Sequence, residues 1–169
     1  AFVPENRLGH SAVPELSLSE NILLSQFPEN NFTNNGIINY QQIQKYVNSV
    51  INKFNVVTPD SEVKASSLSG GNLQKFVIGR EILSNPKLLI ISHPTWGIDA
   101  GAEFAIRESL ISLSKKGTSI IVISQDLDEL FEITHRLSVI FDGNLSNSYQ
   151  TKDVSLEKIG LLMGGHKNV

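Results

Sequence analysis

Three short apolar runs, rich in β-branched residues, lie in the second half of the chain at residues 88–91, 119–123 and 137–141. Runs of this length and composition are typical of strands that are buried on both faces of a parallel sheet. Two stretches with helical periodicity, at about residues 102–116 and 126–135, separate the runs. Strands that alternate with helices predict an α/β layer in which right-handed crossovers join parallel strands.

The first half of the chain follows a different pattern. Residues 17–20, Ser-Leu-Ser-Glu, have the spacing of a capping box and open a short helix that is predicted to end near Pro28. Residues 29–36 are rich in asparagine and are expected to form a polar loop. The clearest helical period comes next, with one apolar face made of Tyr40, Ile43, Val47, Val50, Ile51 and Phe54. Residues 17–66 are therefore expected to form a helical insert before the α/β body.

Composition excludes several classes of protein. The 169 residues are enough to bury a core, and they carry a net charge of −3 and no cysteine. The charge gives no reason to expect nucleic acid as a partner, and the lack of cysteine excludes disulfides and thiolate metal sites. No apolar run approaches the ~20 residues that span a bilayer.

A glycine-rich segment at residues 68–72, Leu-Ser-Gly-Gly-Asn, leads into a helical pattern that stops at Pro86. Two glycines let an anion approach the backbone closely, and the N–H groups of a first helical turn favour negative charge. Ser69 adds a hydroxyl donor. A serine before two glycines is also an ordinary helix cap. The segment therefore predicts a phosphate contact or a cap, and both remain open.

Further segments follow in a fixed order, and together they resemble the ABC transporter ATPase family. Residues 68–75 look like its signature motif, and residues 88–93, Leu-Leu-Ile-Ile-Ser-His, look like its Walker B strand. Residues 96–101, Trp-Gly-Ile-Asp-Ala-Gly, resemble its D-loop, and residues 122–126, Val-Ile-Ser-Gln-Asp, resemble its switch-histidine loop. Upstream, residues 2–7 fall where the family has its Q-loop.

The resemblance is sharpest to the second ATPase domain of tandem-domain subunits that serve importers of simple sugars and nucleosides. Its marks are Pro-Glu-Asn-Arg at residues 4–7, Gly-Gly-Asn-Leu-Gln-Lys at residues 70–75 and Ile-Gly-Leu-Leu-Met-Gly-Gly at residues 159–165. It implies an α/β fold of the P-loop NTPase (ABC ATPase) type, present here in part, with parallel core strands and an α-helical subdomain. It argues against a soluble ABC protein of translation or DNA repair.

The resemblance implies an organisation in four parts. They are the Q-loop region at the end of an incomplete N-terminal core (1–16), the α-helical subdomain (17–66), the α/β core with signature, Walker B, D-loop and switch loop (67–145), and a C-terminal tail (146–169). The implied partners are a second ABC ATPase domain, in tandem or as a dimer, and transmembrane permease subunits. The implied location is the cytoplasm, on the inner face of the cell membrane.

The resemblance also assigns site residues. In this family ATP and Mg²⁺ are bound in the assembled protein, between the Walker motifs of one domain and the signature of the other. The positions that contact nucleotide correspond here to Glu5, Ser69, Gly70, Gly71, Asn72, Gln74 and Asp99. Asp99 is equally suited to cap the helix that begins at Ala100, and Glu5 is equally suited to be a solvated loop acid.

Two departures from the family concern the chain's own ATP site. No G-x-x-x-x-G-K-[ST] loop occurs, so the main phosphate cradle is missing and is expected to lie before Ala1. The Walker B strand, Asp-Glu-Pro-Thr in the family, ends here in Ser-His-Pro-Thr at residues 92–95. Ser92, at the position of the aspartate that holds Mg²⁺, is a neutral and weaker ligand. His93, at the position of the catalytic glutamate, is a plain strand-end histidine or a base, and loss of general-base function lowers a rate by about 10²–10⁴.

The third departure is Gln125, at the position of the switch histidine. Glutamine can hydrogen-bond a γ-phosphate but cannot carry a positive charge. The residues of the chain's own site are thus replaced or missing, whereas those presented to a partner's site are kept. The sequence predicts a catalytically degenerate half that completes a partner's ATP site and that is inactive and binds no nucleotide alone. Two alternatives remain: an active ATPase with His93 as base when the missing part is present, and a remnant that binds no nucleotide.

Overall fold

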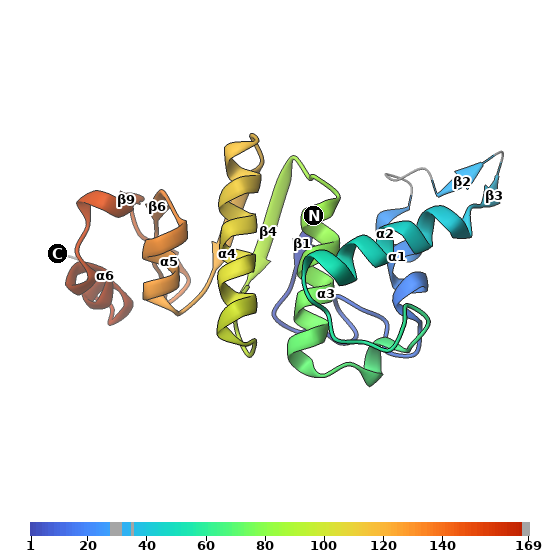
Figure 1. Cartoon of the computed structure of the whole chain (residues 1–169). Helices are drawn as coiled ribbons and strands as arrows, with labels where there is room; N and C mark the ends of the chain where they lie inside the picture. The colour runs from blue at the N-terminus through green and yellow to red at the C-terminus, as the bar shows by residue number, and fades with distance from the viewer. Residues whose placement is uncertain (28–31, 35, 167–169) are drawn as a thin grey trace. The chain divides into compact units, whose positions relative to one another are not determined.

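The computed structural model describes residues 1–27, 32–34 and 36–166 of the chain (Figure 1). The chain forms two compact units with a boundary between Ile123 and Ser124, and each unit is described by itself. This boundary coincides with none of the boundaries expected from the sequence, and the four-part division stays a prediction.

The first unit is built on a three-stranded parallel sheet with the strand order β1-β4-β5. Ile90 in the central strand pairs with Phe2 on one side and with Ile121 on the other. The strands are β1 (Phe2–Val3), β4 (Leu88–Ser92) and β5 (Ser119–Ile123). The first two apolar runs of the second half and their parallel pairing are therefore confirmed.

One face of this sheet is covered within the described part of the chain and the other is not. Leu89 and Ile91 are fully buried, whereas Leu88, Ile121 and Ile123 on the opposite face are between 43% and 50% exposed. Both crossovers step in the same direction across the sheet, and right-handed crossovers then place their helices on one face. The expectation that these strands are buried on both faces is therefore wrong for the residues described.

The described residues of the first unit form four helices. They are α1 (Leu18–Gln26), α2 (Tyr40–Lys53), α3 (Gly70–Leu83) and α4 (Ala100–Lys115), and a short 3₁₀ turn, η1 (Ala65–Ser67), precedes α3. The capping box predicted for α1 is present between Ser17 and Glu20. The predicted apolar face of α2 is buried at Ile43, Val47 and Val50. Tyr40, the first residue of that helix, is the exception and is 67% exposed.

Part of the predicted polar loop at residues 29–36 instead forms a hairpin. Strand β2 (Thr33–Asn34) pairs antiparallel with β3 (Ile37–Ile38). Phe32, just before β2, is buried, and its ring lies edge-on to that of Tyr46 with 5.8 Å between centroids. The buried ring of Phe32 thus packs beside a hairpin in a segment whose composition predicted a loop. Residues 29–31 and 35 of the predicted loop lie outside the described residues.

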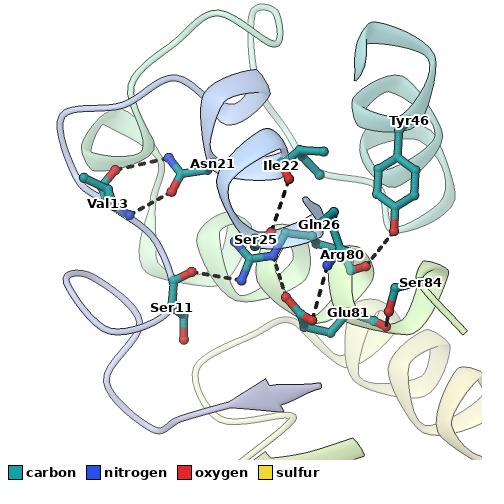
Figure 2. A network of polar contacts seen from close by, with 10 residues as sticks. All are labelled: Ser11, Val13, Asn21, Ile22, Ser25, Gln26, Tyr46, Arg80, Glu81 and Ser84. Carbon is teal, nitrogen blue, oxygen red and sulfur yellow. Dashed lines mark hydrogen bonds and ion pairs between the residues drawn. The ribbon is translucent and has the colours of Figure 1, made fainter. Parts of the chain in front are cut away.

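A buried polar network joins α1, α2 and α3 (Figure 2). On α3, Arg80 and Glu81 are 4% and 7% exposed and form an ion pair with 2.6 Å between Nε and Oε1. Arg80 also donates to the carbonyl of Ser11 at 2.9 Å, and the Tyr46 hydroxyl donates to the carbonyl of Arg80 at 2.9 Å. Gln26 donates to the other carboxylate oxygen of Glu81 at 3.4 Å. The helix that begins in the glycine-rich segment therefore also anchors the helical insert.

The second unit holds helices α5 (Leu127–Ile133) and α6 (Leu156–Met163) and a 3₁₀ turn, η2 (Thr151–Asp153). Its strands form two antiparallel pairs, β6 (Arg136–Leu137) with β9 (Tyr149–Gln150) and β7 (Ile140–Phe141) with β8 (Asn144–Leu145). Nowhere in the described ranges is a helix both long and apolar enough to cross a membrane.

The prediction of a third parallel strand at residues 137–141 is wrong. The run is divided between β6 and β7, and both pair antiparallel. Asp142 and Gly143 have φ of 46° and 72°, as a two-residue type I′ hairpin turn requires. This Asp-Gly turn reverses the chain, so that β7 pairs with β8 in a hairpin. The turn residues, rather than the apolar pattern, therefore decide how this run pairs.

Candidate functional site

The exposed start of α3 has a side-chain cap and also presents backbone N–H groups that can bind an anion. Ser69 is the N-cap, and its Oγ accepts from the backbone N–H of Asn72 at 3.4 Å and from Asn72 Nδ2 at 3.0 Å. Ser69 and Gly70 are both exposed. The cap interpretation is confirmed. Because the first N–H groups of a helix have no intrahelical acceptor, this exposed end still carries the donors that an anion needs.

Asn72 uses its side chain inside the protein. Besides the bond from Nδ2 to Ser69, its Oδ1 accepts from the backbone N–H of Val57 at 2.9 Å. Both ends of the amide are thus engaged, and Asn72 ties the segment before the signature to the start of α3. Its predicted contact with nucleotide stays a prediction.

The turn that follows β4 packs directly against the signature. A Cβ at Gly71 would lie 3.1 Å from the carbonyl oxygen of Gly97, which is tighter than ordinary van der Waals contact. Gly97 itself has φ of 73°, a conformation that glycine adopts without strain. Arg7, from the segment after β1, donates through Nη2 to the carbonyl of Trp96. The segments that resemble the Q-loop, signature and D-loop therefore meet at one place.

Gln74 lies inside this assembly rather than on its surface. It is 1% exposed, and its Nε2 donates to the carbonyls of His93 and Pro94, at 3.1 Å each. Gly71 and Gln74 share one face of α3, and that face is turned toward the loop after β4. The buried amide is engaged with two backbone carbonyls, and the predicted contact of Gln74 with nucleotide stays a prediction.

Asp99 serves two helices. Its Oδ1 accepts from the backbone N–H of Ala102 at 2.9 Å, which confirms it as the N-cap of α4. Its Oδ2 lies 2.8 Å from Lys75 Nζ on α3. The hydrogen bond from Lys75, followed by that from Ala102, holds the pKa of Asp99 below its ordinary value. The carboxylate is 65% exposed and charged at neutral pH, at the surface end of the turn.

The end of β4 lacks an acidic residue. Ser92 closes the strand, and His93 follows with φ of 47° and donates its N–H to the carbonyl of Ile123 at 2.8 Å. A hydroxyl and an imidazole do not make the oxygen-rich ligand set that Mg²⁺ prefers. Among the residues that the structure describes, no three His, Cys, Asp or Glu side chains gather into a metal site. The residues at the Walker B position therefore do not fit a magnesium ion.

Glu5 and Arg7 line a pocket of about 340 Å³ beside the signature. Its other lining residues are Asn6, Leu8, Gly70, Leu73, Trp96 and Gly97. Burial lowers the pKa of Arg7 from its ordinary value, while Glu5 is exposed. The sequence analysis named Arg7 only as part of a Pro-Glu-Asn-Arg segment. Its contact with Trp96 could not be predicted from neighbouring residues, because the two residues are 89 positions apart in the chain.

The first unit brings nine of the predicted site residues into one neighbourhood. They are Glu5, Ser69, Gly70, Gly71, Asn72, Gln74, Ser92, His93 and Asp99. Gln125 belongs to the second unit, where it is exposed and directly precedes Asp126, the N-cap of α5. The role of Gln125 stays a prediction.

No family model matches the sequence. The chain is 36% identical over 163 residues to the guanosine import ATP-binding protein NupO of Bacillus subtilis (strain 168), across 96% of this chain and 32% of that protein. It is 38% identical over 167 residues to the nucleoside import ATP-binding protein NupA of Lactococcus lactis subsp. cremoris (strain MG1363), across 98% and 33%. The ribose import ATP-binding protein RbsA of Oceanobacillus iheyensis is 36% identical over 159 residues, across 94% and 32%. The chain thus spans about a third of the length of these relatives.

Two solved structures share the fold. One is a dimeric, post-hydrolysis state of an ATP-binding cassette bound to ADP and Pi, with a TM-score of 0.72, 21% identity and coverage of 89% of this chain and 62% of that chain. The other is the ATP-binding subunit of an ABC transporter, with a TM-score of 0.76, 19% identity and coverage of 97% and 68%. The chain therefore has the α/β fold of ABC ATPases and, along nearly its whole length, is similar to a segment of proteins named as ATP-binding proteins for the import of sugars and nucleosides.

Proposed function

We propose that this chain is the catalytically degenerate half of an ABC importer ATPase and that it supplies its signature motif to an ATP site on a partner domain. The observation that supports the proposal is an asymmetry between the two ends of the site. The start of α3 keeps an exposed Ser69 and Gly70, and the adjacent Gly71 packs against Gly97 in the turn after β4. The end of β4 offers only Ser92 and His93, where catalysis and metal binding need carboxylates.

In the proposed assembly a second ABC ATPase domain faces this one and holds ATP and Mg²⁺ with its own Walker motifs. The dimeric cassette that shares the fold supports such an arrangement. Permease subunits in the membrane are the proposed second partner, which places the protein on the inner face of the cell membrane. Since relatives are named for import of guanosine, nucleosides and ribose, the proposed solute is a simple sugar or a nucleoside.

The contribution of this chain would be electrostatic. The N–H groups and the positive end of the α3 dipole favour an anion at Ser69, and the serine hydroxyl adds a donor. A polyphosphate held by the partner would gain these contacts only when the two halves close, so its binding would favour the closed state.

The proposal is tested by Ser69→Phe in the assembled transporter. The bulky side chain removes a donor and blocks the approach of phosphate, so we expect ATP turnover to fall by about 10²-fold, as when one positioned donor is lost from an oxyanion site. Gly160→Phe is the control, because a Cβ at that position meets no atom within 4 Å. Turnover should be normal in the control.

The same assay separates the alternatives. His93→Ala should leave the rate unchanged, and a loss of about 10²-fold or more would instead identify His93 as the base. Normal turnover of Ser69→Phe would refute the role of the signature. Failure of the assembled protein to bind nucleotide at any site would favour a remnant.

A further inference from the structure

The seven residues that follow β4, from His93 to Asp99, are held from one side by α3 and the segment before it. This stretch is called the D-loop turn below. Gly71 approaches the middle of the turn closely, and Lys75 pairs with Asp99 at its end. Gln74 binds its beginning through two carbonyls. The D-loop turn is therefore in contact with the first two helical turns of α3, through Gly71, Gln74 and Lys75.

The beginning of the turn has a backbone conformation that its own sequence does not favour. His93 has φ of 47°, in the left-handed region that side chains other than glycine rarely adopt. A residue before proline normally takes an extended conformation, and Pro94 follows directly. A conformation of this kind persists only where the surrounding structure holds it.

Gln74 is placed to hold it. Its amide nitrogen donates to the carbonyls of both His93 and Pro94, so a single side chain fixes two successive peptide groups. Its Oε1 is buried and has no hydrogen-bond partner in the described structure, so the two donated bonds are the polar contacts that the amide makes. The side chain is fully enclosed, which leaves its position little freedom.

We propose that Gln74 is the positioning residue that fixes the D-loop turn to the signature helix. The consequence for the proposed function, on which this last step rests, is that signature and D-loop reach a partner's nucleotide as one rigid body. Gln74 itself touches no nucleotide and acts through the backbone of His93 and Pro94.

The test compares amide hydrogen exchange in the D-loop turn of the 169-residue chain and its Gln74→Met variant. Methionine matches the length of glutamine but donates no hydrogen bond. The Trp96 N–H, which donates to the carbonyl of His93, is the reporter. Loss of two ordinary hydrogen bonds corresponds to roughly tenfold or faster local exchange at this amide.

Gln26→Met is the matched control. Gln26 is also buried, at 2% exposed, and also donates through its amide, but to Glu81 and far along the sequence from the turn. Both variants lose stability, yet only Gln74→Met should loosen the turn while the chain remains folded. If Gln74→Met does not fold, Gln74→Asn keeps the amide and withdraws it by one methylene, and the same exchange is measured.

Equal exchange at Trp96 in the Gln74 and Gln26 variants would overturn the positioning role. Because this measurement uses neither ATP nor a partner domain, its failure leaves the proposed function standing. Conversely, a failed Ser69→Phe test in the transporter would leave the link between Gln74 and the turn intact.

Discussion

At the scale of single residues, Asp99 shows how one side chain can serve both local structure and the site. As N-cap it satisfies a backbone donor of α4, and as the partner of Lys75 it ties that helix to α3. The sequence indicated the cap, because an aspartate before a helical stretch is a local signal. It gave no sign of the ion pair, because Lys75 lies on another helix.

Asp99→Asn should reveal the ion pair as a pH-dependent stability. The pKa of Asp99 is lower in the folded chain than its ordinary value, mainly because of Lys75. The carboxylate therefore contributes stability above the unfolded-state pKa of about 3.9, and this contribution is lost as pH falls through the lower folded-state value. Asparagine keeps the cap, so we expect a lower Tm than wild type near neutral pH and equal Tm values in strong acid.

The measurement is thermal unfolding of both proteins across pH. Glu108→Gln, an exposed acid on the same helix, is the control. A difference in Tm between wild type and Asp99→Asn that stays constant down to the lowest pH would show that the charge on Asp99 is not the cause.

At the scale of elements, α3 connects every part of the first unit. The first helical turn of α3 carries the segment that resembles the signature, and Gln74 in the following helical turn bonds to the D-loop turn. The second half of α3 carries the Arg80–Glu81 pair, which contacts α1, α2 and Ser11 (Figure 2). We therefore expect a displacement of the helical insert to move α3 as well, because the buried Arg80–Glu81 pair links the two.

Arg80→Met should destabilise the first unit strongly. Removing the cation leaves Glu81 buried without its partner, which costs about 3–5 kcal/mol when a buried pair is broken. The measurement is the free energy of unfolding in urea. The double variant Arg80→Met/Glu81→Met should recover part of the loss, because replacing both charges leaves no unpaired one.

Lys64→Met is the matched control for this prediction. The Lys64–Glu15 pair also joins a cation to a carboxylate, but its side chains are 61% and 73% exposed, and we expect its loss to change stability little. If Arg80→Met were as stable as Lys64→Met, the Arg80–Glu81 pair would not be what secures the joint.

At the scale of the whole molecule, the exposed face of the parallel sheet is the feature that remains without a covering layer in the described residues. Phe2, Leu88, Ile121 and Ile123 are each between 43% and 58% exposed on neighbouring strands. Contiguous apolar surface of this kind promotes association. The three-stranded sheet thus presents an apolar face that the described residues leave exposed.

The chain should self-associate through this face as its concentration rises. The double variant Ile121→Thr/Ile123→Thr keeps β-branched residues on the strand but removes apolar surface, so we expect a lower apparent mass by light scattering at equal concentration. Ile140→Thr, at a residue 72% exposed in the second unit, is the control. Association that the double variant does not reduce, or that the control reduces equally, would place the contact elsewhere.

Prediction from the sequence succeeded where a pattern is long or a signal is local. The face of α2 repeats over four turns, and the capping box at Ser17 lies within four residues. It failed for the hairpins β2–β3 and β7–β8, because strands of two residues are too short to show a period. The predicted burial of both sheet faces was also wrong, because an apolar strand does not show whether the described chain supplies a layer of helices for each face.

The sequence by itself determined the order of the motifs and the ends of the helices, because caps such as Ser69 and Asp99 depend only on residues within one turn. Only the tertiary structure decided what the site residues do. Gln74 lies 19 residues from His93 along the chain, and nothing local to either residue specifies that they meet. The packing of α3 against the end of β4 brings them together, and it places the amide of a predicted site residue against two backbone carbonyls.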